Sequence, residues 1–136
     1  HAIVSNAKVL AQSLLDEGLT LVTGGTDNHL MIIRLGDSGP TGKEVARAME
    51  RAGLVANANT VPGETRGAFQ TSGVRVGTPA ATTFGFGPDE FRTIGKLIAG
   101  IVRDPSNADV VKATAGAVRE LCHAVEARRE ASHAHR

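Results

Sequence analysis

Short β-rich runs alternate along this chain with longer stretches of helical apolar spacing, and this alternation restricts the possible fold more than any other feature. Residues 19–23 and 30–35 are β-rich and are separated by the turn Gly-Gly-Thr-Asp-Asn-His. Two glycines followed by Asp-Asn favour a tight reversal, so the two runs are expected to pair antiparallel. Further short strands are expected over residues 54–56 and around residue 75. The predicted sheet is therefore small and mainly antiparallel.

Four stretches place apolar residues three or four positions apart, as one face of an amphipathic helix requires. Thr41 and Glu44 have capping-box spacing at the start of the second stretch, and Ser106 with Asp109 can cap the fourth. The charged tail from Ala127 onward is expected to fray. Helices over a small sheet predict an α+β domain. The four expected apolar faces are Ile3, Ala7, Leu10 and Leu14; Val45, Ala48, Met49 and Ala52; Phe91, Ile94, Ile98 and Ile101; and Val111, Val118, Leu121 and Val125.

Length and composition exclude several classes of protein. The chain has 136 residues and a formal net charge of +1, which suits one globular domain and gives little support to a nucleic-acid or membrane-surface partner. No apolar run approaches the roughly 18 residues that indicate a membrane span. The single cysteine, Cys122, excludes an internal disulfide framework and fits a reducing compartment. It shares an apolar face with Val118 and Val125, so a buried, inert thiol is expected.

Two apparent motifs do not fit the chemistry that they suggest. Residues 36–43 lie between a strand and a helix, where a phosphate-binding loop would stand. That loop requires a glycine where this chain has Asp37 and a Ser or Thr where it has Glu44. His133 and His135 lie in the tail that is expected to fray. The sequence therefore predicts no nucleotide loop, no metal site and no catalytic residue within these residues.

The densest group of amides, hydroxyls and glycines runs from residue 57 to residue 79 and contains Arg75. Val74 and Val76 flank that arginine, so alternation sends the valines to one face of a strand and the guanidinium to the other. A planar, two-pronged donor between glycines suits a carboxylate ligand. A surface arginine on an edge strand fits the same pattern equally well.

Three segments in this order resemble the C-terminal domain of serine hydroxymethyltransferase, a fold-type I enzyme that depends on pyridoxal phosphate. Residues 23–29 read Thr-Gly-Gly-Thr-Asp-Asn-His, residues 57–62 read Asn-Ala-Asn-Thr-Val-Pro, and residues 71–79 read Thr-Ser-Gly-Val-Arg-Val-Gly-Thr-Pro. The resemblance extends from about Ile3 to Val102. It implies that residues 1–136 are the small C-terminal domain of a longer enzyme whose large cofactor-binding domain is absent from this chain. The lack of a capping residue ahead of Ile3 favours the same interpretation.

The resemblance also implies roles for individual positions. Arg75 matches the arginine that binds the α-carboxylate of the amino-acid substrate. Asn59 matches a position that contacts the pterin ring of tetrahydrofolate. Gly67, Ala68 and Phe69 fall on a loop whose backbone lies against the folate.

The implied activity is transfer of a one-carbon unit between serine and tetrahydrofolate, in a cytoplasmic homodimer or tetramer with no nucleic-acid or membrane partner. Pyridoxal phosphate would be held mainly by the missing large domain, because no lysine here follows the Thr-rich segment that precedes the family's cofactor-linked lysine. Residues 1–136 alone are therefore expected to be inactive. The four lysines are Lys8, Lys43, Lys96 and Lys112.

One loop departs from the family pattern and keeps two alternatives open. Where the family commonly has Asp-Pro-[KR]-[ST]-Pro-Phe, residues 64–69 read Glu-Thr-Arg-Gly-Ala-Phe. The loss of both prolines predicts a less stiff loop and weakens the expectation of folate contacts more than that of the carboxylate contact. The alternatives are a folate-independent β-hydroxy amino acid aldolase or transaldolase of the same fold, and a non-catalytic partner subunit of a split enzyme whose separate chain carries the pyridoxal phosphate domain.

Overall fold

A computed structural model describes residues 2–22, 30–36, 39–67, 70–77 and 85–134 of the chain. The glycine-rich turn over residues 23–29 and residues 68, 69 and 135 lie outside the described part. The elements are α1 (Ala2–Asp16), β1 (Thr20–Leu21), β2 (Leu30–Arg34), α2 (Gly42–Arg51), β3 (Asn57–Asn59), β4 (Gly73–Gly77), α4 (Pro88–Arg103) and α5 (Ala108–Ala134).

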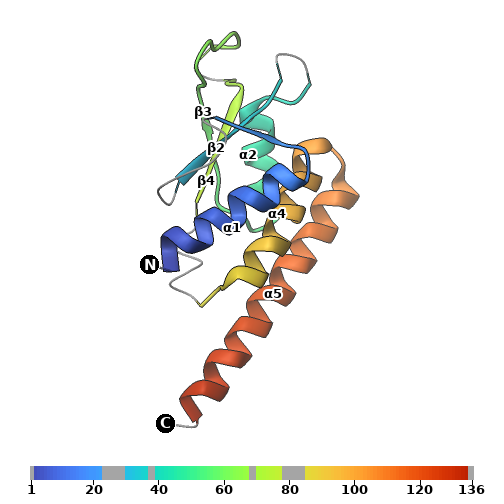
Figure 1. Cartoon of the computed structure of the whole chain (residues 1–136). Coiled ribbons are helices and arrows are strands. Elements are labelled where there is room, and N and C mark those ends of the chain that lie inside the picture. The colour runs from blue at the N-terminus through green and yellow to red at the C-terminus, as the bar shows by residue number, and fades with distance from the viewer. Residues whose placement is uncertain (1, 23–29, 37–38, 68–69, 78–84, 135–136) are drawn as a thin grey trace.

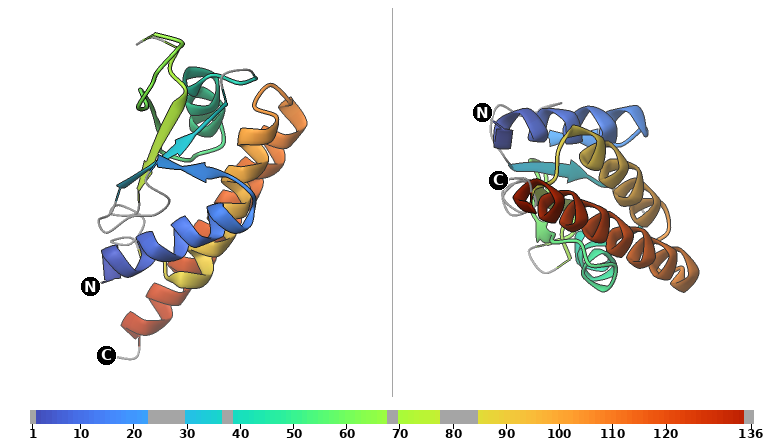
Figure 2. Two further views of the ribbon diagram at one scale, coloured as in Figure 1. Left: turned by 45° about the horizontal axis from the view of Figure 1, so that its top comes forward. Right: turned by 90° about the horizontal axis from the view of Figure 1, so that it is seen from below.

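The strands form one sheet in the order β1-β2-β4-β3, and every neighbouring pair is antiparallel. Helices α1, α4 and α5 lie beside the sheet, and α2 packs next to β3 and β4 (Figures 1 and 2). This arrangement confirms the expected α+β class with a small antiparallel sheet covered by helices. It also confirms the antiparallel pairing of the first two strands.

The sheet has one buried face and one open face, as the alternation of its residues predicts. Met31 and Ile33 of β2 and Val74 and Val76 of β4 are buried, whereas Arg75 is exposed. Alternate residues of a strand point to opposite faces, so the valines pack into the core and the arginine leaves it. This burial pattern confirms the predicted separation of the two valines from the arginine.

The expected helical faces account for most of the core. The apolar stripes of α2 and α4 are fully buried, and the Thr41–Glu44 capping box is present. The Glu44 amide donates to Thr41 Oγ1 at 3.1 Å, and the Thr41 amide donates to Glu44 Oε1 at 3.4 Å. Within the described residues, no helix is both long enough and apolar enough to cross a bilayer.

The strand expected over residues 54–56 is wrong, because β3 begins three residues later at Asn57. Gly53 has a φ of +83° and reverses the chain after α2. The Leu54 amide then donates to the Met49 carbonyl at 2.8 Å, so Leu54 is hydrogen-bonded to the end of α2 and not to a strand. Residues 57–59, at the start of the group rich in amides, hydroxyls and glycines, form the strand instead.

The start and end of α5 also differ from expectation. Asn107, and not Ser106, caps the helix, because Asn107 Oδ1 accepts from the Asp109 amide at 3.0 Å and the Val110 amide at 3.3 Å. The helix continues through the charged tail to Ala134. Arg128 ties this part of α5 to the start of α4, which explains why the helix does not end near Ala127. Its Nη2 donates to the Gly85 carbonyl at 3.0 Å and to Glu90 Oε1 at 2.8 Å.

Helices α1 and α4 cross at a contact that has room only for glycine. A Cβ atom on Gly95 would lie 2.2 Å from Ser13 Oγ and 2.6 Å from Ser13 Cβ. The Ser13 hydroxyl donates to the Arg92 carbonyl at 2.9 Å, which fixes it at this crossing. The two helices must therefore separate to accept any larger residue.

Gly95→Ala is expected to lower the free energy of unfolding by about 1–3 kcal/mol, because overpacking outweighs the better helix propensity of alanine. Gly100→Ala is the matched control in the same helix, since a Cβ there meets nothing within 4 Å. The control is expected to stabilise by up to about 1 kcal/mol. Urea unfolding of both variants measures the difference, and equal effects of the two would contradict this account of the crossing.

Candidate functional site

The open face of the sheet brings Arg75 and Asn57 side by side. Arg75 pairs with Ile32 of β2 on one side and with Asn57 of β3 on the other. Side chains of directly paired residues lie on the same face, so the three form one row across the sheet. Both Arg75 and Asn57 are exposed.

A second row on the same face contains Asn59. Its register partner is Gly73, which in turn pairs with Arg34. Because strand side chains repeat with a period of two, this row faces the same way as the row of Arg75. Gly73 has no room for a side chain: a Cβ there would lie 2.7 Å from the Asn59 carbonyl oxygen and 3.0 Å from Ile32 Cγ2. The register therefore places the predicted residues Arg75 and Asn59 on one surface.

The Arg75 guanidinium is free to receive a ligand. No hydrogen bond or ion pair engages it within the described part of the chain. The alternative of an arginine on an edge strand is wrong, because β4 lies between β2 and β3. An interior strand holds its backbone by hydrogen bonds on both sides, so Arg75 projects from a rigid base. A planar fork of donors in this position suits a carboxylate.

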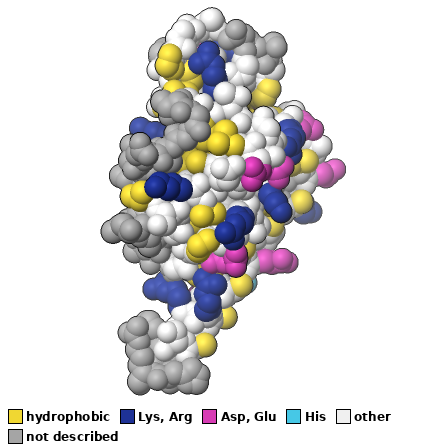
Figure 3. Space-filling view, in the orientation of Figure 1, with side chains coloured by type: hydrophobic (Ala, Val, Ile, Leu, Met, Phe, Trp, Pro, Cys, Tyr) yellow, Lys and Arg dark blue, Asp and Glu magenta, His cyan; other side chains and the backbone are white. Residues whose placement is uncertain are grey.

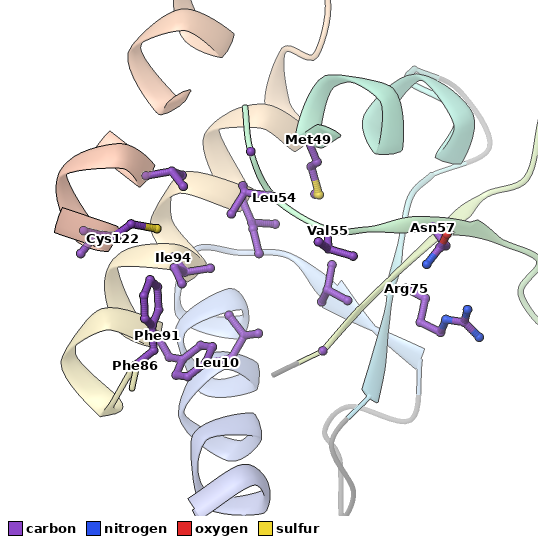
Figure 4. A pocket seen from close by; sticks show the side chains of 16 residues that line it. Leu10, Met49, Leu54, Val55, Asn57, Arg75, Phe86, Phe91, Ile94 and Cys122 are labelled. Carbon is purple, nitrogen blue, oxygen red and sulfur yellow. The ribbon is translucent and has the colours of Figure 1, made fainter. Parts of the chain in front are cut away.

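A cavity of about 610 Å³ lies beneath this surface and is lined mainly by apolar residues. Arg75 and Asn57 lie at one end of the cavity, and the guanidinium points away from the cluster of Leu10, Phe86 and Phe91 (Figure 4). The cavity and the open face therefore meet at the Arg75 row. Among the described residues, the polar groups that line the cavity gather at this end.

Cys122 differs from the expected buried thiol. Its side chain is half-buried and lines the cavity. Val125, on the same helix face, is fully buried, whereas Val118 lines the cavity with Cys122. The apolar face of α5 is therefore only partly covered at this cysteine.

Glu64 organises the β3–β4 loop, defined as residues 60–72. Its Oε2 accepts from the Ser72 hydroxyl at 2.6 Å and from the amides of Thr65 and Arg66 at 3.1 and 3.2 Å. Its Oε1 accepts from the Ser72 amide at 2.7 Å. These donors, the Ser72 hydroxyl first, outweigh the opposing effect of burial and lower the pKa of Glu64 to about 2. The carboxylate is therefore ionised throughout the neutral range.

Two arginines attach the same loop to other parts of the structure. Arg66 Nη1 donates to the Pro40 carbonyl at 2.6 Å, and its Nη2 donates to the Gly39 carbonyl at 3.3 Å. Arg34 Nη1 donates to the Pro62 carbonyl at 3.2 Å. The loop lacks both prolines of the family pattern, but side-chain hydrogen bonds of Arg66 and Arg34 attach it to the rest of the structure.

A strained backbone position joins this loop to β4. Thr71 has a φ of +58°, is 2% exposed, and donates from its hydroxyl to the Gly73 carbonyl at 3.1 Å. The first amide of α2, that of Gly42, donates to the Thr71 carbonyl at 3.0 Å. The Thr71 amide in turn donates to the Gly67 carbonyl at 3.1 Å. Such strain persists only where surrounding contacts enforce it, and it often marks functional sites.

Of the folate positions predicted from the sequence, the structure describes Asn59 and Gly67. Asn59 Nδ2 donates to the Thr60 carbonyl at 2.8 Å, and Gly67 is exposed with a φ of +81°. Ala68 and Phe69 lie outside the described residues. Asn59 and Arg75 therefore share one face, and Gly67 lies within the β3–β4 loop.

Sequence reasoning did not identify Asn57 and Glu64. Asn57 stands two positions before Asn59, so the two-residue period of a strand could have placed both on the face of Arg75. Glu64 contacts Ser72, eight positions later in the chain, and no local sequence pattern predicts that contact.

None of the four lysines lines the cavity beside Arg75. No three His, Cys, Asp or Glu side chains within the described ranges group so as to hold a metal ion. On the face seen in Figure 3, Lys and Arg side chains are interspersed with Asp and Glu, so this face carries no patch of a single charge.

Comparison with known proteins identifies relatives. Residues 1–98 match the family described as serine hydroxymethyltransferase. The serine hydroxymethyltransferase of Haloquadratum walsbyi is 51% identical over 120 residues, which cover 87% of this chain and 29% of that protein. The enzyme of the same name from Erythrobacter litoralis is 48% identical over 128 residues, covering 90% of this chain and 30% of that protein. The enzyme of the same name from Haloarcula marismortui is 52% identical over 120 residues, which cover 87% of this chain and 29% of that protein. The chain thus spans less than a third of these relatives.

The low pKa of Glu64 predicts a pH dependence of stability. A carboxylate whose pKa falls from 4.5 to about 2 on folding stabilises the fold above pH 4.5, and this contribution is lost as the pH falls toward 2. Glu64→Gln is therefore expected to unfold at lower urea concentration than the parent at pH 7 and to converge with it near pH 2. Ser72→Ala, which removes the main cause of the shift, is expected to lose part of the same pH dependence. Parallel curves for parent and Glu64→Gln between pH 5 and 2 would contradict the assignment.

Proposed function

Because this chain belongs to the serine hydroxymethyltransferase family, we propose that it is the small C-terminal domain of a longer transferase that moves a one-carbon unit between serine and tetrahydrofolate. The observation that carries the proposal is the position of Arg75. Its guanidinium, which no described residue engages, projects from an interior strand on the face that also carries Asn59. The similarity to serine hydroxymethyltransferases supports the transferase activity, to which this chain contributes residues as one domain of the whole enzyme.

Arg75 is proposed to bind the α-carboxylate of the amino acid. Two parallel N–H donors match the two oxygens of a carboxylate, and such charge-assisted pairs are about twice as strong as neutral hydrogen bonds. Pairing on both sides of β4 keeps the base of the side chain in place. A fixed carboxylate sets the orientation of the rest of the amino acid, which is the main requirement for breaking one chosen bond at its α-carbon.

The folate is proposed to lie along Asn59 and the backbone of Gly67, Ala68 and Phe69. The common face of Asn59 and Arg75 supports this, because both substrates must reach one reaction centre. The exposure of Gly67 leaves its backbone open to a flat ring.

Pyridoxal phosphate is proposed to be bound by the rest of the longer protein. It supplies an electron sink for cleavage at the substrate's α-carbon. The complete enzyme is proposed to be a cytoplasmic homodimer or tetramer whose ligands are small molecules.

A folate-independent aldolase or transaldolase is the second candidate. The observation that favours it is the replaced loop at residues 64–69, where both family prolines are absent. This alternative keeps the role of Arg75 and removes the role of Asn59.

Arg75→Ala in the full-length enzyme is expected to lower kcat/KM for serine by at least about 100-fold, because two charge-assisted hydrogen bonds are lost. Arg75→Lys keeps the charge but loses the planar fork, so it is expected to raise the serine KM and lower kcat. The cofactor absorbance spectrum, which is expected to stay unchanged, reports that both variants are folded. Arg47→Ala is the matched control, since Arg47 is exposed on α2 and away from the open face. Near-parental kcat/KM in Arg75→Ala would end this assignment.

Asn59→Ala is expected to weaken tetrahydrofolate binding by about 2- to 10-fold, the cost of roughly one neutral hydrogen bond. Folate-independent cleavage of a β-hydroxy amino acid by the same variant is expected to stay unchanged. Gln12→Ala is the control, because Gln12 is an exposed amide on α1 whose side chain contacts Asp16 and not the sheet. Steady-state kinetics with and without folate measure both effects. A parent enzyme with no folate dependence would instead favour the aldolase.

A further inference from the structure

The β3–β4 loop is held by side chains that the proposed function does not use: one contact closes it on itself, and two attach it to other parts of the structure. Glu64 binds Ser72, which directly precedes β4. Arg66 binds the carbonyls of the segment ahead of α2, and Arg34 of β2 binds the loop at Pro62. The loop lacks both family prolines over residues 64–69, yet it has a defined position relative to the sheet.

Glu64 is the central attachment, because its carboxylate joins the two sides of the loop. The two amides that it accepts from, those of Thr65 and Arg66, belong to the outgoing side. The amide and hydroxyl of Ser72 belong to the returning side, at a residue that is 2% exposed. The four hydrogen bonds are charge-assisted, and the two to Ser72 are the shortest at 2.7 and 2.6 Å.

The returning side leads directly to the carboxylate-binding residue. Ser72 lies three positions before Arg75, and its carbonyl accepts from the Leu35 amide at 2.7 Å, which anchors it to the end of β2. The outgoing side begins at Asn59 and leads to Gly67. One carboxylate therefore joins the part of the loop that leads to Gly67 to the residue that directly precedes β4, the strand of Arg75.

We propose that Glu64 is a positioning residue for folate: it holds the β3–β4 loop against β4, so that the loop meets the folate while Arg75 holds the amino acid. This inference rests on the proposed function. Arg75 itself is held by the pairing of β4 with β2 and β3, which does not involve Glu64. Loss of the Glu64 carboxylate is therefore expected to weaken folate binding and to leave binding of the amino acid unchanged.

The test uses Glu64→Gln in the full-length enzyme. An amide has one acceptor oxygen, so either the Ser72 amide or the amides of Thr65 and Arg66 must face an NH₂ group. The KM for tetrahydrofolate is expected to rise about 5- to 10-fold, whereas the serine KM, kcat and folate-independent cleavage of a β-hydroxy amino acid stay within about twofold.

Two further variants separate positioning from general damage to the fold. Glu44→Gln is the matched control, because its carboxylate also accepts hydrogen bonds but caps α2 through Thr41. It is expected to leave the folate KM unchanged. Ser72→Ala removes the hydroxyl partner and is expected to raise the folate KM alone. Combining it with Glu64→Gln is expected to add little to the effect of Glu64→Gln, since both act through one contact.

Each outcome decides between the two proposals. A selective rise in the folate KM supports the role of Glu64. An unchanged folate KM, or equal losses in folate KM, serine KM and folate-independent cleavage, overturns that role and leaves the proposed function standing. A parent enzyme that does not use folate overturns the proposed function, and the role of Glu64 fails with it.

Discussion

Strand β4 pairs with β2 along all five of its residues and with β3 over residues 73–75, so its backbone is hydrogen-bonded on both sides where Arg75 projects. This double pairing determines which surface of the domain can bind a ligand. One face of β4 contributes Val74 and Val76 to the core, and the other carries the guanidinium. A shift of the register by one residue would bury the arginine and expose the valines. The core and the site therefore depend on the same pairing.

The start of β4 is fixed by contacts that leave little freedom. A Cβ on Gly42 would lie 2.1 Å from Thr71 Oγ1 and 2.3 Å from the Gly73 carbonyl oxygen, so α2 approaches this corner as closely as a backbone can. Thr71 keeps its left-handed conformation because its carbonyl and hydroxyl are both engaged there. The conformational energy stored at Thr71 is thus offset by the docking of α2.

Local patterns in the sequence predicted the features that have local causes. Alternation placed Val74 and Val76 opposite Arg75, and capping chemistry located the start of α2. Residues 54–56 were misassigned because the reversal at Gly53 engages Leu54 before the sheet begins. The interior position of β4 could not be predicted, since strand order depends on pairing between distant segments.

The sequence likewise pointed to some residues of the candidate site and not to the contacts that hold its loop. The resemblance of residues 57–62 and 71–79 to a known family predicted roles for Asn59 and Arg75, and strand register brings the two residues to one face. The contacts of Glu64 and Arg66 escaped prediction because their partners, Ser72 and Pro40, are remote in the chain and are reached only after folding. Side-chain hydrogen bonds of this kind leave no periodic signal in a single sequence.

The two ends of the β3–β4 loop are pinned together, because Asn59 and Gly73 are partners in the sheet. Substitutions, insertions or deletions between them can therefore alter the loop without displacing Arg75. Under the proposed function, the sheet binds the amino acid and the loop contacts the second reactant. Changes in the loop could then alter the second reactant while the binding of the amino acid stays the same.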